Sequence, residues 1–410
     1  MKITAVKSAI IGRNIVIRVV TDKGIDGYGQ VEEGKDYVRP LIPYFAEMIL
    51  GCDPTNVESV VRRMRRSGGF KPWGKIMSTI EMALWDIAGK DAGIPVYKLL
   101  GGKVRDKVRV YNGSFQNPNP PHKNADTPEK QGENILALNE LPEGFTIVKG
   151  GGLYHGRPHS NYFTHSGIHD FSYNVYLSDP EDNTPYPMGG LLTERALNHY
   201  VDYVARIKSV VKDKVGLAFD VGPGLTAVDT LRLAKALEPF NLLWLEDTIA
   251  GDYTPYTLAH IYRDITANTT TPIHTGEQMY LRQNFRELIE MHAVNVVGPD
   301  PADVGGIAEL KWIAEYANMH GILMAPHGTI DGVFGMAALT HVCAAMPDNY
   351  IAYEYPAGRP EWWYDIVDGL PDPLLRDGHV KVWDKPGLGV EFNINKASKY
   401  LSAEDKDFFM

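Results

Sequence analysis

GLAFD at residues 216–220 is the first of five short apolar runs that end on a residue able to hold a divalent metal or move a proton. The others are LLWLED (242–247), PIHTGE (272–277), VNVVGPD (294–300) and ILMAPH (322–327). A segment with helical spacing of its apolar residues follows each run, which predicts repeated β/α units. In a barrel of parallel strands, side chains at the carboxyl ends of the strands converge at one mouth. We therefore expect these residues to meet there: Asp220, Glu246, Glu277, Asp300 and His327.

Three further runs extend the same pattern on both sides. VRVYNG (108–113) and FTIVKG (145–150) precede the five runs, and YIAYEY (350–355) follows them, which makes eight strand candidates. Helical patterns lie between most of them. Eight such strands with crossover helices predict an α/β protein with a closed, modified (β/α)8 barrel of the TIM type, or (β/α)7β.

The chain before the barrel predicts a smaller α+β module over residues 1–110. Two alternating segments, ITAVKSAIIG (3–12) and NIVIRVVTDKG (14–24), are typical of antiparallel strands with one covered face. Helical periodicity follows in VESVVRRMRR (57–66) and MSTIEMALWDIAGKDAG (77–93). Strands followed by helices favour an α+β cap on the barrel.

Composition excludes several classes of protein. The 410 residues carry 51 acidic and 41 basic side chains, a net charge of −10, without a block of like charge, which argues against a nucleic-acid partner. The two cysteines, Cys52 and Cys343, have no neighbour at metal-ligand spacing, so a reducing compartment is permitted. No apolar run has the length of a signal peptide or a membrane span. We therefore expect a cytoplasmic protein with no membrane partner.

One segment has a specific resemblance. STIEMALWDIAGKDAGIPVYKLLGG (78–102) resembles the end of the capping domain in the mandelate racemase branch of the enolase superfamily (mandelate racemase/muconate lactonizing enzyme-like). There a helix carrying ALWD leads through PVYKLLGG into the barrel. The segment DKPGLGVEFN (384–393) also resembles this family, whose C-terminal tail folds back onto the cap. The resemblance implies a cap of residues 1–110 completed by 372–410, and a barrel over 111–371.

Three strand-end acids, Asp220, Glu246 and Glu277, are the candidate metal ligands. Converging carboxylate oxygens suit Mg²⁺, which prefers hard oxygen ligands. A single acid of this kind would be better interpreted as an isolated strand-end residue, but three in successive β/α units, together with the cap resemblance, favour the metal. Asp247 should point away from the same face and have a structural role.

Asp300 and His327 end the next two strands, so they should lie within hydrogen-bonding range. A carboxylate paired to an imidazole fixes its tautomer and raises its basicity. The pair resembles the Asp–His dyad of the superfamily, and Glu354 matches the acid that hydrogen-bonds the developing enediolate. Lys149 stands where the family has the first lysine of a Lys-x-Lys pair.

Two positions depart from the family's pattern. Gly151 replaces the second lysine, and Gly222 stands where some sugar-acid dehydratases have a histidine. A two-base racemase of the usual kind is therefore disfavoured. His327 would then serve as both base and acid, or a histidine such as His155 would take the second role.

The predicted reaction is Mg²⁺-dependent dehydration of an acid sugar, an aldonate or aldarate. Imidazole cannot remove a proton α to a carboxylate unless the enediolate is stabilised as it forms, which Mg²⁺ does. Loss of a β-hydroxyl then gives a 2-keto-3-deoxy acid. An epimerase, racemase or cycloisomerase would use the same enediolate. Two other classes stay open: a metal-independent glycoside hydrolase and a non-catalytic sugar-acid binding protein.

Residues 152–190 form a long insertion with several histidines and aromatic side chains and almost no apolar period. A loop of this length in a barrel is usually functional or disordered, and we expect a lid or a subunit contact. Substrate contacts are predicted from His155 in the insertion and from Arg13 and Trp73 in cap loops. The expected assembly is a homo-oligomer, from dimer to octamer.

Overall fold

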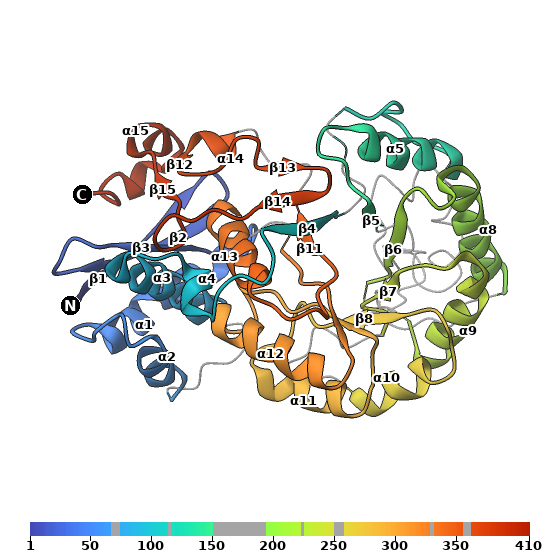
Figure 1. Cartoon of the computed structure of the whole chain (residues 1–410), viewed down its shortest axis with the longest axis horizontal. Helices are drawn as coiled ribbons and strands as arrows, with labels where there is room; N and C mark the ends of the chain where they lie inside the picture. Colours follow the sequence, from blue (N-terminus) through green and yellow to red (C-terminus); the bar gives the residue numbers. More distant parts are fainter. Residues whose placement is uncertain are drawn as a thin grey trace, which may run out of the picture.

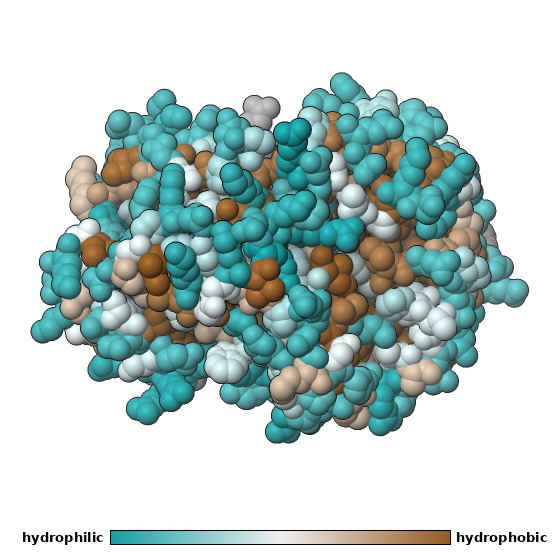
Figure 2. All heavy atoms as spheres, in the orientation of Figure 1, coloured by the Kyte–Doolittle hydropathy of each residue, from teal (hydrophilic) through white to brown (hydrophobic). Residues whose placement is uncertain are grey.

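The structure is a computed structural model that describes residues 1–66, 74–113, 117, 119–150, 194–222, 225–249, 258–328, 332–355 and 362–410. Figure 1 shows a small unit that contains both chain termini beside a larger ring of strands and helices. No helix among these residues is both long and apolar enough to cross a membrane. The face drawn in Figure 2 is largely hydrophilic, with apolar side chains interspersed.

The small unit is a three-stranded antiparallel sheet covered by helices. The sheet order is β1 (Ile3–Ile11), β2 (Asn14–Thr21), β3 (Gly27–Gln30). The accompanying helices are η1 (Asp36–Leu41), α1 (Ile42–Ile49), α2 (Val57–Arg65) and α3 (Gly74–Ala92). A Cβ at Gly27 would lie 2.0 Å from the Ala83 carbonyl oxygen, so only glycine lets α3 pack this closely on β3. The predicted α+β cap is present.

The larger unit contains all eight predicted strands, and they pair in parallel. They are β4 (Lys107–Asn112), β5 (Ile147–Gly150), β6 (Gly216–Asp220), β7 (Trp244–Glu246), β8 (Ile273–Thr275), β9 (Val296–Val297), β10 (Leu323–Met324) and β11 (Tyr353–Tyr355). Pairing runs in sequence order from β4 to β10, and β11 joins the other side of β4. This is the predicted TIM-like α/β barrel.

Helices surround these strands on the outside (Figure 1). A short helix, α4 (Val96–Leu99), leads from the cap toward β4. The helices that follow are α5 (Pro128–Glu140), α8 (Glu194–Val211), α9 (Ala227–Leu237), η3 (Glu238–Phe240), α10 (Ala259–Thr266), α11 (Arg282–Glu290), α12 (Ile307–Met319) and α13 (Gly332–Ala344).

The prediction of a closed barrel is wrong in one respect, because the ladder of paired strands is open between β10 and β11. β10 and β11 do not pair as strands, and a single bridge between Met324 and Tyr350 connects these two parts of the chain. Pro326 follows β10 and has no N–H to donate, although its carbonyl accepts a hydrogen bond from the Glu354 N–H at 2.8 Å. The proline therefore limits the ladder at this position.

The C-terminal segment contacts both units. Its elements are α14 (Trp362–Asp365), β12 (Val367–Asp368), β13 (Leu375–Arg376), β14 (His379–Lys381), β15 (Glu391–Phe392), α15 (Ile394–Ala397), η4 (Ser398–Tyr400) and η5 (Ala403–Asp405). β14 adds to the barrel sheet, antiparallel to β4. The last residues lie on the cap, where Lys7 Nζ donates to the Met410 carbonyl at 2.6 Å and Arg18 Nη1 donates to the Phe408 carbonyl at 2.8 Å.

Candidate active site

The interior of the barrel has an apolar layer directly below the predicted site. This layer is a cluster of fully buried residues that includes Ile147, Ala218, Trp244, Ala325 and Ala352. Each of them precedes a predicted site residue by two positions. Because alternate residues of an extended chain point to the same side, the next inward-facing side chains are polar. They are Lys149, Asp220, Glu246, His327 and Glu354.

Asp220 and Glu246 are the last residues of neighbouring strands, and they pair directly in the register of β6 and β7. Glu277 comes two residues after the end of β8. The Asp220 Oδ1 accepts a hydrogen bond from the Gly222 N–H at 2.8 Å, and the Glu277 Oε1 accepts one from Gln278 Nε2 at 3.1 Å. The three predicted metal ligands therefore stand at the carboxyl ends of three consecutive strands.

Glu246 is held from two sides. Its Oε2 accepts a hydrogen bond from Trp244 Nε1 at 2.8 Å and lies 3.3 Å from His274 Nδ1. Its Oε1 contacts the ammonium group of Lys149. Trp244 and His274 stack with ring centroids 5.3 Å apart. One carboxylate oxygen thus contacts Trp244 and His274, while the other contacts Lys149.

Lys149 connects two of the acids. Its Nζ lies 3.3 Å from Glu354 Oε1 and also contacts Glu246. The same ammonium lies 5.7 Å from the centroid of the Tyr111 ring, which is a cation–π distance. Burial lowers the pKa of Lys149, but the two carboxylates outweigh it and raise the pKa well above 10.5. Lys149 is therefore a cation.

Asp300 and His327 form the predicted hydrogen-bonded pair. The Asp300 Oδ2 lies 2.6 Å from His327 Nδ1, while its Oδ1 accepts a hydrogen bond from the Ala302 N–H at 2.6 Å. His327 Nε2 lies 3.4 Å from Glu277 Oε2 and 3.4 Å from Glu354 Oε2. Because Asp300 can only accept, Nδ1 carries the proton, and Nε2 is the nitrogen that faces the mouth.

Two sequence families match the chain along most of its length. Residues 2–101 match the mandelate racemase/muconate lactonizing enzyme N-terminal domain, and residues 185–397 match the enolase C-terminal domain-like family. A D-xylonate dehydratase from Haloferax volcanii is 31% identical over 98% of this chain and 89% of its own length. A D-galactonate dehydratase from Ralstonia pickettii is 29% identical over 93% and 89%.

A solved structure agrees with these matches. The mandelate racemase/muconate lactonizing enzyme-like protein from Rubrobacter xylanophilus superposes with a TM-score of 0.79 at 30% identity, covering 98% of both chains. The chain belongs to the mandelate racemase/muconate lactonizing enzyme family. It is thus an enzyme of the enolase superfamily, and the two curated relatives described above are named as dehydratases, which are hydro-lyases.

Members of the enolase superfamily are in general Mg²⁺-dependent. Such an ion is bound by acidic oxygen ligands. The site has an excess of acid: Asp220, Glu246, Glu277, Asp300 and Glu354 face Lys149 and His327. Burial raises the pKa of Asp220 to about 7, and Glu246 and Glu277 add to this rise. Carboxylates that repel one another in this way favour a bound cation.

The acids have the right type of ligand atom for Mg²⁺, but their side chains are not arranged around a common metal position. Within the described part of the chain, no group of three or more His, Cys, Asp or Glu side chains is arranged to hold a metal ion. The Lys149 ammonium contacts Glu246 Oε1 and places a positive charge beside this carboxylate. The donor types of Asp220, Glu246 and Glu277 fit Mg²⁺, and their role as ligands stays a prediction.

The electrostatic environment of His327 follows from the same acids. Burial lowers its pKa, but Glu277, Glu354 and Asp300 outweigh this and raise the pKa well above 6.5. In turn, burial raises the pKa of Glu277, whereas His327 and Lys149 hold it at about 2. The protonated form of His327 is therefore favoured as long as no bound cation offsets the negative charge of these carboxylates.

Of the three predicted substrate contacts, only Arg13 lies within the described residues. Arg13 lies in the turn between β1 and β2, where its Nη1 bonds Glu33 Oε1 at 3.0 Å and its side chain is 75% exposed. No contact in the described ranges joins it to the barrel residues. Trp73, His155 and the insertion 152–190 lie outside the described residues. Substrate binding by Arg13, Trp73 and His155 stays a prediction.

Sequence reasoning missed the residues that hold Glu246 in place. Trp244 precedes Glu246 by two positions, so the period of a strand could have placed both on the same side. His274 gave no such indication, because its ring packs against Gly298, which directly follows the next strand. A Cβ at Gly298 would lie 2.3 Å from His274 Nε2. Asp247, predicted to be structural, accepts a hydrogen bond from Thr275 Oγ1 at 2.8 Å.

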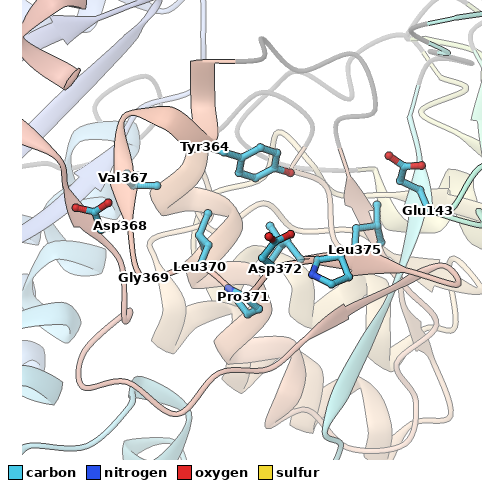
Figure 3. Close-up of a pocket in the computed structure, with 11 residues that line it drawn as sticks. Glu143, Tyr364, Val367, Asp368, Gly369, Leu370, Pro371, Asp372 and Leu375 are labelled. Atoms are coloured by element: carbon cyan, nitrogen blue, oxygen red, sulfur yellow. The ribbon is translucent and has the colours of Figure 1, made fainter.

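A different pocket, with a volume of about 470 Å³, is drawn in Figure 3. It is lined by residues 367–375 together with Tyr364 and Glu143. Figure 3 shows the Tyr364 ring and the Asp372 carboxylate on this wall, with Glu143 on a separate segment. Its lining contains none of the predicted site residues, so we assign the chemistry to the barrel mouth.

Proposed function

We propose that the protein is a Mg²⁺-dependent acid-sugar dehydratase that converts an aldonate or aldarate to a 2-keto-3-deoxy acid. The observation that carries this proposal is the environment of His327, whose Nδ1 is bound to Asp300 while Nε2 faces Glu277 and Glu354. The names of the relatives from Haloferax volcanii and Ralstonia pickettii support the same class of reaction.

In this proposal, Asp220, Glu246 and Glu277 hold the metal ion. A bound Mg²⁺ supplies positive charge that stabilises the substrate carboxylate as negative charge develops on it, and it offsets the charge of Glu277 beside His327. Lys149, which is buried between Glu246 and Glu354, orients the substrate carboxylate. Trp244 keeps the Glu246 carboxylate in one orientation.

His327 carries out both proton transfers. Its neutral Nε2 accepts the proton from the carbon α to the substrate carboxylate, and the C–H electron pair moves into the carboxylate to form the enediolate. The imidazolium is stabilised by Asp300 through Nδ1. The bond from the β-carbon to its hydroxyl then breaks, and the leaving hydroxide takes the proton from Nε2 to depart as water. The enol product tautomerises to the 2-keto-3-deoxy acid.

Glu354 acts on the enediolate from the eighth strand. Its carboxyl group is 2% exposed, and its two oxygens lie beside His327 Nε2 and Lys149 Nζ. This places Glu354 where the family has the acid that hydrogen-bonds the enediolate oxygen as charge develops there. Since Gly151 stands where the family has a second lysine, elimination by His327 alone is favoured over epimerisation.

The proposal is tested with a library of aldonates and aldarates that includes D-xylonate and D-galactonate. Formation of a 2-keto acid is measured with Mg²⁺ and with excess EDTA. We expect at least one substrate to give product only with the metal, and His327→Asn to abolish turnover. His320 lies at the C-terminal end of α12, away from the barrel mouth. The variant His320→Asn is therefore the control and should retain activity.

Other outcomes would identify other functions. Metal-dependent exchange of the α-proton without 2-keto acid would indicate an epimerase, racemase or cycloisomerase. Metal-independent cleavage of a glycoside would indicate a hydrolase. Binding of an acid sugar without turnover would indicate a binding protein. Any of these results would overturn the dehydratase proposal.

A further inference from the structure

The loop between Asp300 and α12 is held by one face of the cap helix α3. Lys75 Nζ contacts the Asp303 carboxylate, and Ser78 Oγ accepts a hydrogen bond from the Gly305 N–H at 2.9 Å. Glu81 accepts hydrogen bonds from the N–H groups of Ile307 and Ala308 at 2.7 and 2.9 Å. Lys75, Ser78 and Glu81 are three residues apart, so they form one stripe along the helix.

These contacts are buried and closely fitted. Lys75, Ser78 and Glu81 are each at most 2% exposed. The N–H groups at the start of α12 have no partner within that helix, and Glu81 satisfies two of them from another part of the chain. Gly306 has a φ of 103°, and a Cβ there would lie 2.0 Å from Glu81 Oε2. The loop therefore requires glycine at the point where α3 approaches.

The same loop continues without a break to the dyad. The Asp300 carbonyl accepts hydrogen bonds from the N–H groups of Asp303 and Val304 at 3.0 and 2.7 Å. The Asp300 side chain is tied to the Ala302 N–H and to His327 Nδ1. A displacement of Asp303 thus changes the geometry of the turn that places the Asp300 carboxylate.

We propose that Lys75, Ser78 and Glu81 of the cap helix are positioning residues for the Asp300–His327 pair of the barrel. The proposal rests on the function proposed above for that pair. Lys75 also bonds Glu32 Oε2 at 2.9 Å, in the segment after β3, so a single ammonium connects two cap elements to the catalytic loop. Docking of the cap and orientation of the dyad are then coupled.

The alternative is that these contacts only fasten the cap to the barrel. The chain provides a control on the same helix, because Lys90 is a partly buried lysine that also has two carboxylate partners, Asp86 and Glu391. Glu391 belongs to the C-terminal segment and not to the dyad loop. Thr79 is likewise the control for Ser78, because its Oγ1 bonds the Lys75 carbonyl and its methyl group faces Gly29.

The test compares Lys75→Met with Lys90→Met, and Ser78→Ala with Thr79→Ala. Two measurements are made well below the melting temperature. The first is kcat and KM on an acid sugar that the library assay finds to be a substrate. The second is the NMR signals of the His327 ring in protein labelled with ¹⁵N-histidine. His327→Asn assigns the signals. We expect Lys75→Met to lower kcat by about 10- to 100-fold with little change in KM, since a small misplacement of a catalytic group has an effect of that size.

Ser78→Ala should lower kcat less, and it keeps the test informative if Lys75→Met does not fold. Both variants should shift the Nδ1 signal of His327, and Lys75→Arg should restore it in part. Lys90→Met and Thr79→Ala should lower only the melting temperature. An unchanged His327 signal in Lys75→Met or Ser78→Ala, or an equal change in their controls, would overturn the proposal. If no acid sugar is dehydrated, the NMR comparison still tests the positioning role of the cap helix. Failure of the dehydratase proposal and failure of the positioning proposal can therefore be distinguished.

Discussion

Asp300 determines which nitrogen of His327 can take a proton. The Asp300 Oδ2 is 2.6 Å from Nδ1, so the proton stays on that nitrogen and Nε2 is free to act. We predict that Asp300→Asn lowers kcat by about 100-fold or more, because an amide can stabilise the other tautomer and cannot stabilise the imidazolium. Steady-state kinetics on the identified acid sugar measure this. A kcat within a few-fold of the wild-type value would show that Asp300 does not orient the base.

Glu246 and Asp247 are neighbours with different predicted roles. One Glu246 oxygen contacts Lys149, whereas Asp247 bonds Thr275. We predict that Glu246→Gln weakens Mg²⁺ binding by at least about 10-fold, since even indirect partners of a metal site contribute that much. Isothermal titration calorimetry with MgCl₂ measures the affinity, and Asp247→Asn is the matched control. Equal Mg²⁺ affinities in the two variants would exclude Glu246 as a ligand.

Single residues also show how far the sequence could be interpreted. The strand period and the β/α repeat can be read from the sequence, so the ends of the apolar runs predicted which side chains meet at one mouth: Asp220, Glu246, Glu277, Asp300 and His327. The role of Glu354 was implied by the family resemblance. The contact of His274 with Glu246 needed two further strands to be placed, so no local rule indicated it. Arg13 was predicted from its residue type and its place in a cap loop, and its role in substrate binding stays a prediction; in the structure it bonds Glu33 on the surface.

Helix α3 and helix α12 meet through Glu81, which makes the junction sensitive to pH. Burial raises the pKa of Glu81 to about 8, and the neighbouring Glu309 adds to the rise, although three N–H donors oppose it. Between the ordinary value of 4.5 and about 8, the folded chain keeps a proton that the unfolded chain has lost. The free energy of unfolding therefore falls as pH rises across this window.

We predict that Glu81→Gln removes this contribution, which is at most about 5 kcal/mol across the window. Urea unfolding at about pH 5, 6.5 and 8 measures the slope. The wild type should lose more stability than Glu81→Gln as pH rises, while Glu315→Gln, on the partly exposed side of α12, should keep the wild-type slope. Parallel slopes for wild type and Glu81→Gln would show that Glu81 has an ordinary pKa.

The helices and strands were predicted better from the sequence than the contacts between them. The two periods of the sequence, two for strands and near 3.6 for helices, predicted every barrel strand and the cap helix α3. The missing ladder between β10 and β11 depends on the relative position of Pro326 and Tyr350, which periodicity does not describe. The contacts of α3 with the loop after Asp300 join residues more than 200 positions apart, and only the folded structure brings them together.

The whole molecule is predicted to assemble with further copies of itself. One chain has a mass of 45.6 kDa, and apolar side chains such as Trp312 and Met319 are more than half exposed on it. A homo-oligomer would cover part of such surface. Light scattering coupled to size-exclusion chromatography should give a mass of at least twice that of one chain. A mass near that of a single chain at micromolar concentration would contradict the prediction.

The proposed mechanism depends most on His327 Nε2 as the group that removes the α-proton, and solvent exchange measures that step directly. Wild-type protein and His327→Asn are incubated in D₂O with Mg²⁺ and the acid sugar, and deuterium at the α-carbon is followed by ¹H NMR together with 2-keto acid formation. We predict that His327→Asn loses both exchange and elimination while it still binds Mg²⁺. If His327→Asn loses elimination but retains exchange, another group such as Lys149 is the base, and the assignment of His327 is wrong.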